Sequence, residues 1–260
     1  MNTEPSIIDV ESYWNARPCN IRHGISEIGT KQYFDEVENR KYFVESHIPK
    51  FSEFDLWSGK KVLEIGCGIG TAAISFARAG ALYTGVELSS TSLDLAKKRF
   101  EVYGYNANFY QGNAEHLSDF LPLEEYDLIY SFGVIHHSPN PEKIVNQIQN
   151  YMNLNSEFRL MLYAKNSWKN IMIEAGFDQP EAQSGCPVAY TYSHEEVRSL
   201  LWGYKILDLR QAHIFPYVIE KYVKHEYEIL PYFKSMPPEV FAALEKKLGW
   251  HTLIKCKLDQ

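Results

Sequence analysis

A glycine-rich turn between an apolar strand and a helix is the feature that most constrains how this chain folds. Residues 61–65 (KVLEI) form a short apolar run, and Gly66, Gly68 and Gly70 follow before a helical pattern begins. Glycine lets a backbone turn sharply and approach a ligand that a side chain would block. The start of the next helix adds free N–H groups and the positive end of a dipole. The loop therefore predicts a nucleotide-type site.

Strands and helices alternate along the chain after this loop. Further strands are expected at 82–87, 107–111, 126–131, 157–163, 205–215 and 250–257, and helices at 71–79, 90–103, 141–152 and 193–201. Such alternation is typical of βαβ units and a parallel sheet. We therefore predict an α/β fold with a doubly wound, mostly parallel, seven-stranded Rossmann-like sheet, a reversed C-terminal strand and an inserted aromatic cap.

Three aromatic-rich segments fall outside this alternation. We expect four parts: an N-terminal cap or lid (1–57), a nucleotide-binding core (58–163), a cap insertion (164–192) and the C-terminal part of the sheet (193–260). The last part carries an insertion at 216–249, which predicts two helices separated at 235–238 (SMPP). Residues 13–23 show no helical period, so they are expected to form a loop.

Composition excludes several classes of protein. The chain has 26 Lys and Arg against 33 Asp and Glu, a net charge of −7, which argues against a nucleic-acid binder. Its four cysteines form no CxxC pair, so neither a zinc site nor a disulfide framework is expected, and no metal is predicted. No apolar run approaches a membrane span, and the N-terminus has no signal-peptide pattern. A cytoplasmic protein is therefore expected.

Two kinds of nucleotide fit the glycine loop. Gly68-x-Gly70-x-x-Ala73 matches the loose dinucleotide pattern of nicotinamide-dependent enzymes. Glu64, Glu87 and Asn113 favour a different ligand. They are placed, respectively, to meet a cationic group, to bind two ribose hydroxyls and to read an adenine edge.

Three stretches of sequence resemble those of the class I S-adenosylmethionine (SAM)-dependent methyltransferases. They are VLEIGCGIGTAAISFARAGALYTGVELS, GNAEHL and YDLIYSFGVIHH. The resemblance is nearest to the small-molecule group that includes the ubiquinone/menaquinone C-methyltransferases. It covers residues 57–163 strongly and residues 193–257 through strand order. These motifs are specific for SAM and unspecific for the methyl acceptor.

The resemblance implies roles for the residues around the glycine loop. Glu64, Gly66, Gly68 and Gly70 would line the methionine and ribose part of SAM. Glu87 would hold both ribose hydroxyls.

The ends of the next strands complete the implied cofactor site. Leu88 would pack on the adenine, Asn113 would face its amino group, and Ala114 would face a ring nitrogen. The family often has Asp at the position of Asn113, and Asn keeps the acceptor oxygen. Ser131 and Phe132 would lie beside the sulfonium.

Histidines are the candidate catalytic bases. His136 and His137 follow the fourth strand at the edge where reacting groups gather, and His213 lies on the sixth strand. A histidine there can take a proton from a hydroxyl or an amine. Since a sulfonium is already an activated leaving group, a base is needed only for an unreactive nucleophile. We take His136 and His213 as candidates, and each is also explained as a packing histidine.

Aromatic and basic residues outside the core are candidates for covering the ligands. Tyr13, Trp14 and Arg17 are expected to close over SAM, and Trp168, which follows the fifth strand, to line the acceptor pocket. A surface strap and a dimer contact are the alternatives for these segments, so a homodimer is left open.

The sequence thus predicts a SAM-dependent methyltransferase that transfers a methyl group to a small-molecule or peptide acceptor by in-line displacement. A non-catalytic SAM-binding protein and an NAD(P)-dependent oxidoreductase are the alternatives. The acceptor and the methylated atom are not specified by any motif.

Overall fold

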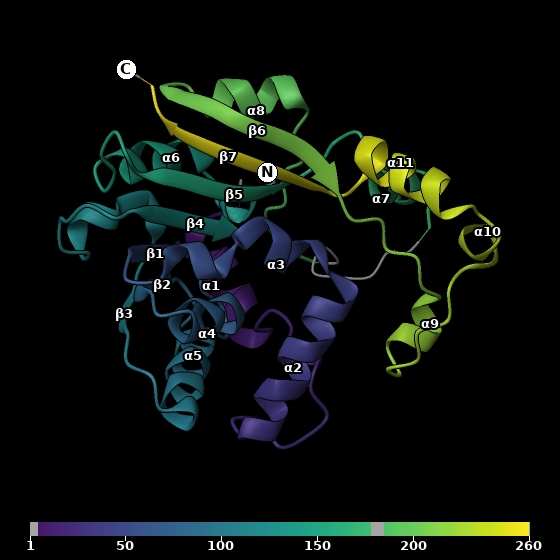
Figure 1. Ribbon diagram of the computed structural model, residues 1–260, viewed down its shortest axis with the longest axis horizontal. Coiled ribbons are helices and arrows are strands. Elements are labelled where there is room, and N and C mark those ends of the chain that lie inside the picture. Colours follow the sequence, from purple (N-terminus) through teal and green to yellow (C-terminus); the bar gives the residue numbers. More distant parts are fainter. Residues whose placement is uncertain (1–4, 178–184, 260) are drawn as a thin grey trace.

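A seven-stranded sheet runs through the middle of the protein (Figure 1). The computed structural model describes residues 5–177 and 185–259. The strand order is β3-β2-β1-β4-β5-β7-β6. The strands are β1 (Lys61–Ile65), β2 (Leu82–Glu87), β3 (Asn108–Gln111), β4 (Leu128–Phe132), β5 (Glu157–Tyr163), β6 (Tyr204–Ala212) and β7 (His251–Leu258).

The strand directions confirm the predicted α/β fold with a reversed C-terminal strand. Strands β1 to β5 are parallel, whereas β7 lies antiparallel between β5 and β6. The chain runs outward from β1 through β2 to β3 and then returns to β4 on the other side of β1. Such a reversal opens a crevice at the carboxyl ends of the strands, where α/β proteins bind ligands.

Helices cover both faces of the sheet. On one face, α6 (Pro141–Gln149), α8 (His194–Leu200) and the short helix η2 (Ala114–Asp119) contribute to one apolar cluster. On the other, α4 (Thr71–Arg78) and α5 (Ser90–Tyr103) pack through side chains such as Phe76, Leu93 and Phe100. The burial of these apolar faces on both sides is the doubly wound arrangement that the sequence predicts.

The N-terminal segment is more helical than expected. It forms α1 (Ile7–Ala16), α2 (Lys31–Val44), α3 (His47–Ser52) and the short helix η1 (Phe54–Trp57). The prediction of a loop over 13–23 is wrong for its first residues, which end α1. A capping box between Ser6 and Asp9 starts this helix, and its signal lies outside the aromatic stretch.

The C-terminal insertion also differs from its prediction. It contains three helices, α9 (Ile219–Tyr222), α10 (Pro231–Lys234) and α11 (Pro238–Leu248), where two were expected. The first expected helix is interrupted because His225 has φ +64° and the backbone of Val218 bonds to that of Glu228. Helix α7 (Trp168–Glu174) begins the cap insertion, whose residues 178–184 lie outside the described residues.

Two further observations concern the ends of elements. Strand β6 stops at Ala212, earlier than predicted, because His213 has a left-handed backbone with φ +71°. Among the helices of the described ranges, none has the length and apolar character needed to cross a bilayer.

Candidate functional site

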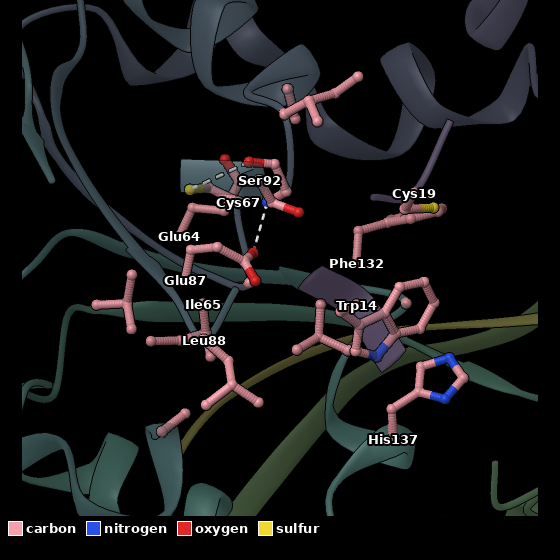
Figure 2. Close-up of a pocket in the computed structure, with 18 of the residues that line it drawn as sticks. Trp14, Cys19, Glu64, Ile65, Cys67, Glu87, Leu88, Ser92, Phe132 and His137 are labelled. Atoms are coloured by element: carbon pink, nitrogen blue, oxygen red, sulfur yellow. Dashed lines mark hydrogen bonds between the residues drawn. The ribbon is translucent and has the colours of Figure 1, made fainter. Parts of the chain in front are cut away.

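A cavity lies at the carboxyl ends of β1, β2 and β4, at the crevice of the sheet (Figure 2). Eight of the ten residues predicted to bind SAM line it: Glu64, Gly66, Gly68, Glu87, Leu88, Asn113, Ala114 and Phe132. Gly70 and Ser131 are not among its lining residues.

The three glycines of the loop meet different surroundings. A Cβ on Gly68, which has φ +54°, would meet no atom within 4 Å, so this position opens into the cavity. A Cβ on Gly66 would lie 2.3 Å from Cγ2 of Val134, and one on Gly70 would lie 3.2 Å from Ala96. Gly68 therefore leaves room for a ligand, whereas Gly70 lets α4 start close against α5.

Glu87 is a buried carboxylate fixed at the cavity wall. Its Oε2 accepts the N–H of Gly68 at 2.7 Å (Figure 2), and its Oε1 accepts the N–H of Ser89 at 3.0 Å. Burial raises the pKa of Glu87, and the two backbone donors oppose that rise. Each oxygen keeps a further lone pair for a ligand hydroxyl.

Glu64 is the second buried carboxyl of the cavity. It accepts a hydrogen bond from the Tyr83 hydroxyl at 2.5 Å. Burial raises the pKa of Glu64 to about 7, and the hydrogen bond from Tyr83 opposes the rise. A cationic group placed beside Glu64 would favour its ionised form. The site is therefore suited to a ligand with a positive charge at this end.

The turn after β3 forms the predicted adenine end. Asn113 caps η2, because its Oδ1 accepts the N–H of Glu115 at 3.0 Å. One lone pair of that oxygen and the amide N–H groups remain for other partners. Leu88 and Ala114 add apolar surface to the same part of the cavity.

The end of β4 brings one of its two predicted residues to the cavity. Phe132 lines it, whereas Ser131 is buried with its hydroxyl unpartnered within the described residues. Successive side chains of a strand point to opposite faces, which separates the two.

Of the predicted lid and substrate residues, only Trp14 lines the cavity. Its ring meets that of His137 edge-on at 5.2 Å (Figure 2), and the ring of Tyr13 also meets it edge-on, at 5.0 Å. Arg17 is exposed after the end of α1. Trp168 begins α7 and contacts Phe233 of α10 at 5.5 Å.

The predicted histidine bases do not line this cavity. His136 is fully buried, both of its ring nitrogens are unpartnered within the described residues, and its ring stacks 3.8 Å from that of Tyr163. It is Tyr163 and the neighbouring His137 that line the cavity. His137 bonds through Nδ1 to the carbonyl of Val188 at 2.7 Å, and burial lowers its pKa to about 4. His213 belongs to a separate cluster with His47 and His251.

Sequence reasoning missed several lining residues. Cys19, Asn20, Lys41, Ile48 and Tyr163 come from the N-terminal segment and from β5. They lie in no motif of the glycine loop. Lys41 and Ile48 reach the cavity from α2 and α3, Cys19 and Asn20 from the turn after α1, and Tyr163 from the end of β5.

Comparison with known proteins agrees with this geometry. The family described as "Methyltransferase domain" matches residues 56–200. The chain is 35% identical over 100 residues to the ubiquinone biosynthesis O-methyltransferase of Glaesserella parasuis serovar 5 (strain SH0165), covering 36% of this chain and 41% of that protein. It is 34% identical over 88 residues to the protein of the same name from Klebsiella pneumoniae (strain 342), covering 34% and 36%. The chain thus spans about two fifths of the length of these relatives.

Among solved structures, the chain is similar to the magnesium protoporphyrin IX methyltransferase of Synechocystis PCC 6803 with bound S-adenosylhomocysteine (SAH). The TM-score is 0.64 at 16% identity, over 98% of this chain and all of that one. At this identity the likeness concerns the fold. Since the family match covers more than half of the residues and confirms the resemblance seen in the sequence, this chain belongs to the methyltransferase-domain family of the class I SAM-dependent methyltransferases.

Proposed function

We propose that this protein transfers a methyl group from SAM to a hydroxyl oxygen of a small molecule. One observation carries the cofactor assignment: the buried Glu87 carboxylate is held by the N–H of Gly68, where the loop opens into the cavity. A fixed carboxylate of this kind suits a pair of vicinal hydroxyls. The names of the relatives, which are O-methyltransferases, support the hydroxyl.

The residues of the cavity fit SAM from end to end. Glu64 would meet its positively charged methionine end, Glu87 its ribose, and Leu88, Asn113 and Ala114 its adenine. When bound, SAM supplies an electrophilic methyl group on a sulfonium. A sulfonium leaves without further activation, so the chain mainly has to position the acceptor and exclude water.

The cap contributes this positioning in our proposal. Trp14 covers the cavity from α1, with Tyr13 packed behind it. Lys41 of α2 reaches the end of β4, where its Nζ lies 6.0 Å from the centre of the Phe132 ring. We keep Arg17 and Trp168 as candidates for contacts made outside the cavity, since one is exposed and the other packs on α10.

A reducing compartment such as the cytoplasm is also part of the proposal. All four cysteines, Cys19, Cys67, Cys186 and Cys256, are free thiols. Free thiols are typical of proteins in reducing compartments.

Isothermal titration with SAM, SAH and NADH tests the cofactor assignment. We expect the protein to bind SAM and SAH and not NADH. Glu87→Ala should weaken SAM by ten- to a hundredfold, since hydrogen bonds to a charged group contribute roughly 1.5–3 kcal/mol. Glu101→Ala, at an exposed position of α5, is the matched control and should leave SAM affinity unchanged. Binding of NADH in place of SAM would reverse the assignment.

Turnover separates an enzyme from a non-catalytic SAM-binding protein. The protein is incubated with SAM and a panel of phenols, catechols and aliphatic alcohols, and released SAH is measured. Release that depends on one class of hydroxyl supports the proposal. Tight SAM binding with no release across the panel would contradict it.

A further inference from the structure

Three histidines and a glutamate form a buried cluster that the cofactor site does not use. Nε2 of His47 lies 2.9 Å from Nδ1 of His251, a hydrogen-bond distance. Nε2 of His251 lies 3.7 Å from a carboxylate oxygen of Glu45, which is itself buried. The ring of His213 lies against both of the other rings, at 5.2 Å from His47 and 4.9 Å from His251.

The cluster adjoins the cavity at the end of β4. The ring of Phe132, which lines the cavity, lies 6.1 Å from that of His47 and 5.6 Å from that of His251. Lys41 and Ile48, on either side of His47 in the sequence, also line the cavity. His47 is not itself among the lining residues, and its ring lies beside Phe132, which is.

One nitrogen of the cluster is open. Nδ1 of His47 has no hydrogen-bond partner in the described part of the chain, and it is not among the buried unpartnered atoms there. His47 is half-buried, so Nδ1 reaches accessible space while Nε2 bonds to His251.

The arrangement selects one set of tautomers. The Glu45 carboxylate is too far from His251 for a hydrogen bond, but it favours a proton on the facing Nε2. Nδ1 of His251 is then the acceptor, so Nε2 of His47 must carry the shared proton. Nδ1 of His47 is left with a free lone pair, which can accept a proton.

The backbone of His213 is a second, independent sign of a functional cluster. Its φ of +71° is a left-handed conformation, which costs a non-glycine residue of order 1–3 kcal/mol. Glycine would remove that cost, yet this position keeps an imidazole stacked on the His47–His251 pair. Strain of this kind is concentrated at active sites.

We propose that His47 is the general base of the methyl transfer, with His251 and Glu45 as positioning residues that stabilise the proton it gains. The proposal rests on the proposed hydroxyl acceptor and specifies it further, as a hydroxyl that is un-ionised when it binds. The O–H bond of the acceptor and the S–CH₃ bond break, and an O–CH₃ bond and an N–H bond at His47 Nδ1 form. The sulfur keeps the electron pair of the broken bond.

Electrostatics agree with a neutral base that is charged only during the reaction. Burial, with Lys41 nearby, lowers the pKa of His47 to about 3, so its imidazole is neutral before the reaction. The transfer removes a positive charge from the sulfur as a proton arrives at His47, so the net charge of the site is unchanged. Glu45 supplies the negative charge that an imidazolium on His251 would need.

The first test reads the tautomers directly, without turnover. Nitrogen-15 NMR of the histidine rings is recorded on SAH-saturated protein near neutral pH, with His47→Gln and His251→Gln used to assign the signals. We expect a proton on Nε2 and none on Nδ1 in both rings. A proton on Nδ1 of His47, or a charged ring, would overturn the proposal.

The second test compares two acceptors near neutral pH: catechol, which is un-ionised, and 4-nitrocatechol, which is ionised. His47→Gln should lower kcat by about 10²- to 10⁴-fold for catechol and by less than about tenfold for 4-nitrocatechol. SAH affinity should stay within about threefold. His194→Gln is the matched control, because His194 also begins a short helix but is exposed, and its kcat values should be unchanged.

The outcomes separate the two hypotheses. Equal losses for both acceptors, or no loss for either, in an active wild-type background would overturn the role of His47 and leave the methyltransferase function intact. A wild-type protein that methylates no hydroxyl of the acceptor panel would overturn the proposed hydroxyl acceptor, and with it the role of His47. Glu45→Gln should lower kcat for catechol about tenfold at unchanged KM. A change in KM alone would contradict the role of Glu45 as a positioning residue.

Discussion

At the scale of residues, the three glycines of the loop after β1 share a positive φ but differ in what surrounds them. Gly66, Gly68 and Gly70 all have positive φ, but only at Gly68 would a Cβ meet open space. The sequence shows that glycine stands at these three positions. It does not show whether a ligand or a packed side chain excludes a Cβ at each of them. The ligand-facing position is therefore a property of the packed structure.

Gly68→Val should abolish SAM binding while the protein stays folded. The side chain would enter the cavity, and the left-handed backbone would add a cost of about 1–2 kcal/mol. Gly104→Val is the matched control: Gly104 has φ +72°, again with no atom within 4 Å of a Cβ, but caps α5. Calorimetry should detect a similar loss of stability in both variants and loss of SAM binding in Gly68→Val alone. Unchanged SAM affinity in Gly68→Val would exclude the loop from the site.

Glu64 should release a proton when SAM binds. Its folded-state pKa of about 7 lies above its ordinary 4.5, so it is largely protonated near pH 6 in the free protein. A bound cation lowers that pKa, and release should approach about one proton per SAM near pH 6 and vanish above about pH 8. Titration in two buffers of different ionisation enthalpy measures it. Glu64→Gln should show no release, and release that persists there would place the proton elsewhere.

The raised pKa of Glu64 also makes stability depend on pH. The folded state favours the protonated form, so stability falls as the pH rises from about 4.5 through about 7. Glu64→Gln should therefore become more stable than the wild type by up to about 3 kcal/mol across that range, as followed by urea unfolding. If the free energy of unfolding varied with pH in the same way in both proteins, the buried Glu64 carboxyl would not be the cause of the pH dependence.

At the scale of elements, the side chain of Asn15 ties α1 to the start of α5. Oδ1 of Asn15 accepts the hydroxyl of Ser89 at 2.9 Å and, at 3.3 Å each, the hydroxyl of Ser90 and the N–H of Thr91. These residues start α5, next to Glu87. Trp14, one residue before Asn15, is thereby tied to the turn that follows Glu87, the residue proposed to bind the ribose.

Asn15→Ala should loosen α1 and speed up the release of the cofactor. The loss of these hydrogen bonds, of order 1 kcal/mol in all, should raise the dissociation rate of SAH roughly five- to tenfold. Stopped-flow tryptophan fluorescence would follow it, with Ser12→Ala on the exposed side of α1 as the control. Equal rates in the two variants would mean that Asn15 does not hold the lid.

The sequence predicts the elements that have a local signal. The strands β1 to β5, the helices α4 to α6 and the reversed β7 carry periodicity, caps and glycine stops, and they lie within a few residues of their predicted bounds. Eight of the ten predicted cofactor residues line the cavity for the same reason, since they lie at the ends of strands or just after them. Helices α2 and α3 were not expected, and neither was the break between α9 and α10. His47 and His251, which are 204 residues apart in the sequence, meet only through long-range packing, which leaves no pattern in the sequence.

At the scale of the whole molecule, Arg159 joins the N-terminal segment to the sheet. On β5 it is buried, pairs with Glu157 and Glu53, and donates from Nη1 to the carbonyls of Phe51 and Ser52 at 2.6 and 2.9 Å. Removing one partner of a buried network leaves charges and carbonyls without compensation. The position of α3, and with it His47, depends on this side chain.

Arg159→Ala should lower the free energy of unfolding by about 3–5 kcal/mol. Arg210→Ala is the control, because Arg210 on β6 also pairs with an acid two residues earlier, Asp208, but is exposed. Arg210→Ala should lower the free energy of unfolding by less than about 1 kcal/mol. Urea unfolding measures both, and similar values would contradict the anchoring role of Arg159.

The stretch of chain that defines the family is smaller than the unit that builds the cavity. Residues 56–200 match the family. Trp14, Lys41 and Ile48 line the cavity from outside that stretch, and the imidazoles of His47 and His251, also outside it, lie against Phe132. A gene exchange that carried only the matched stretch would bring the cofactor loop without its cover or its proposed base. The cavity is therefore encoded by two parts of the gene, and both would have to be transferred together to rebuild it.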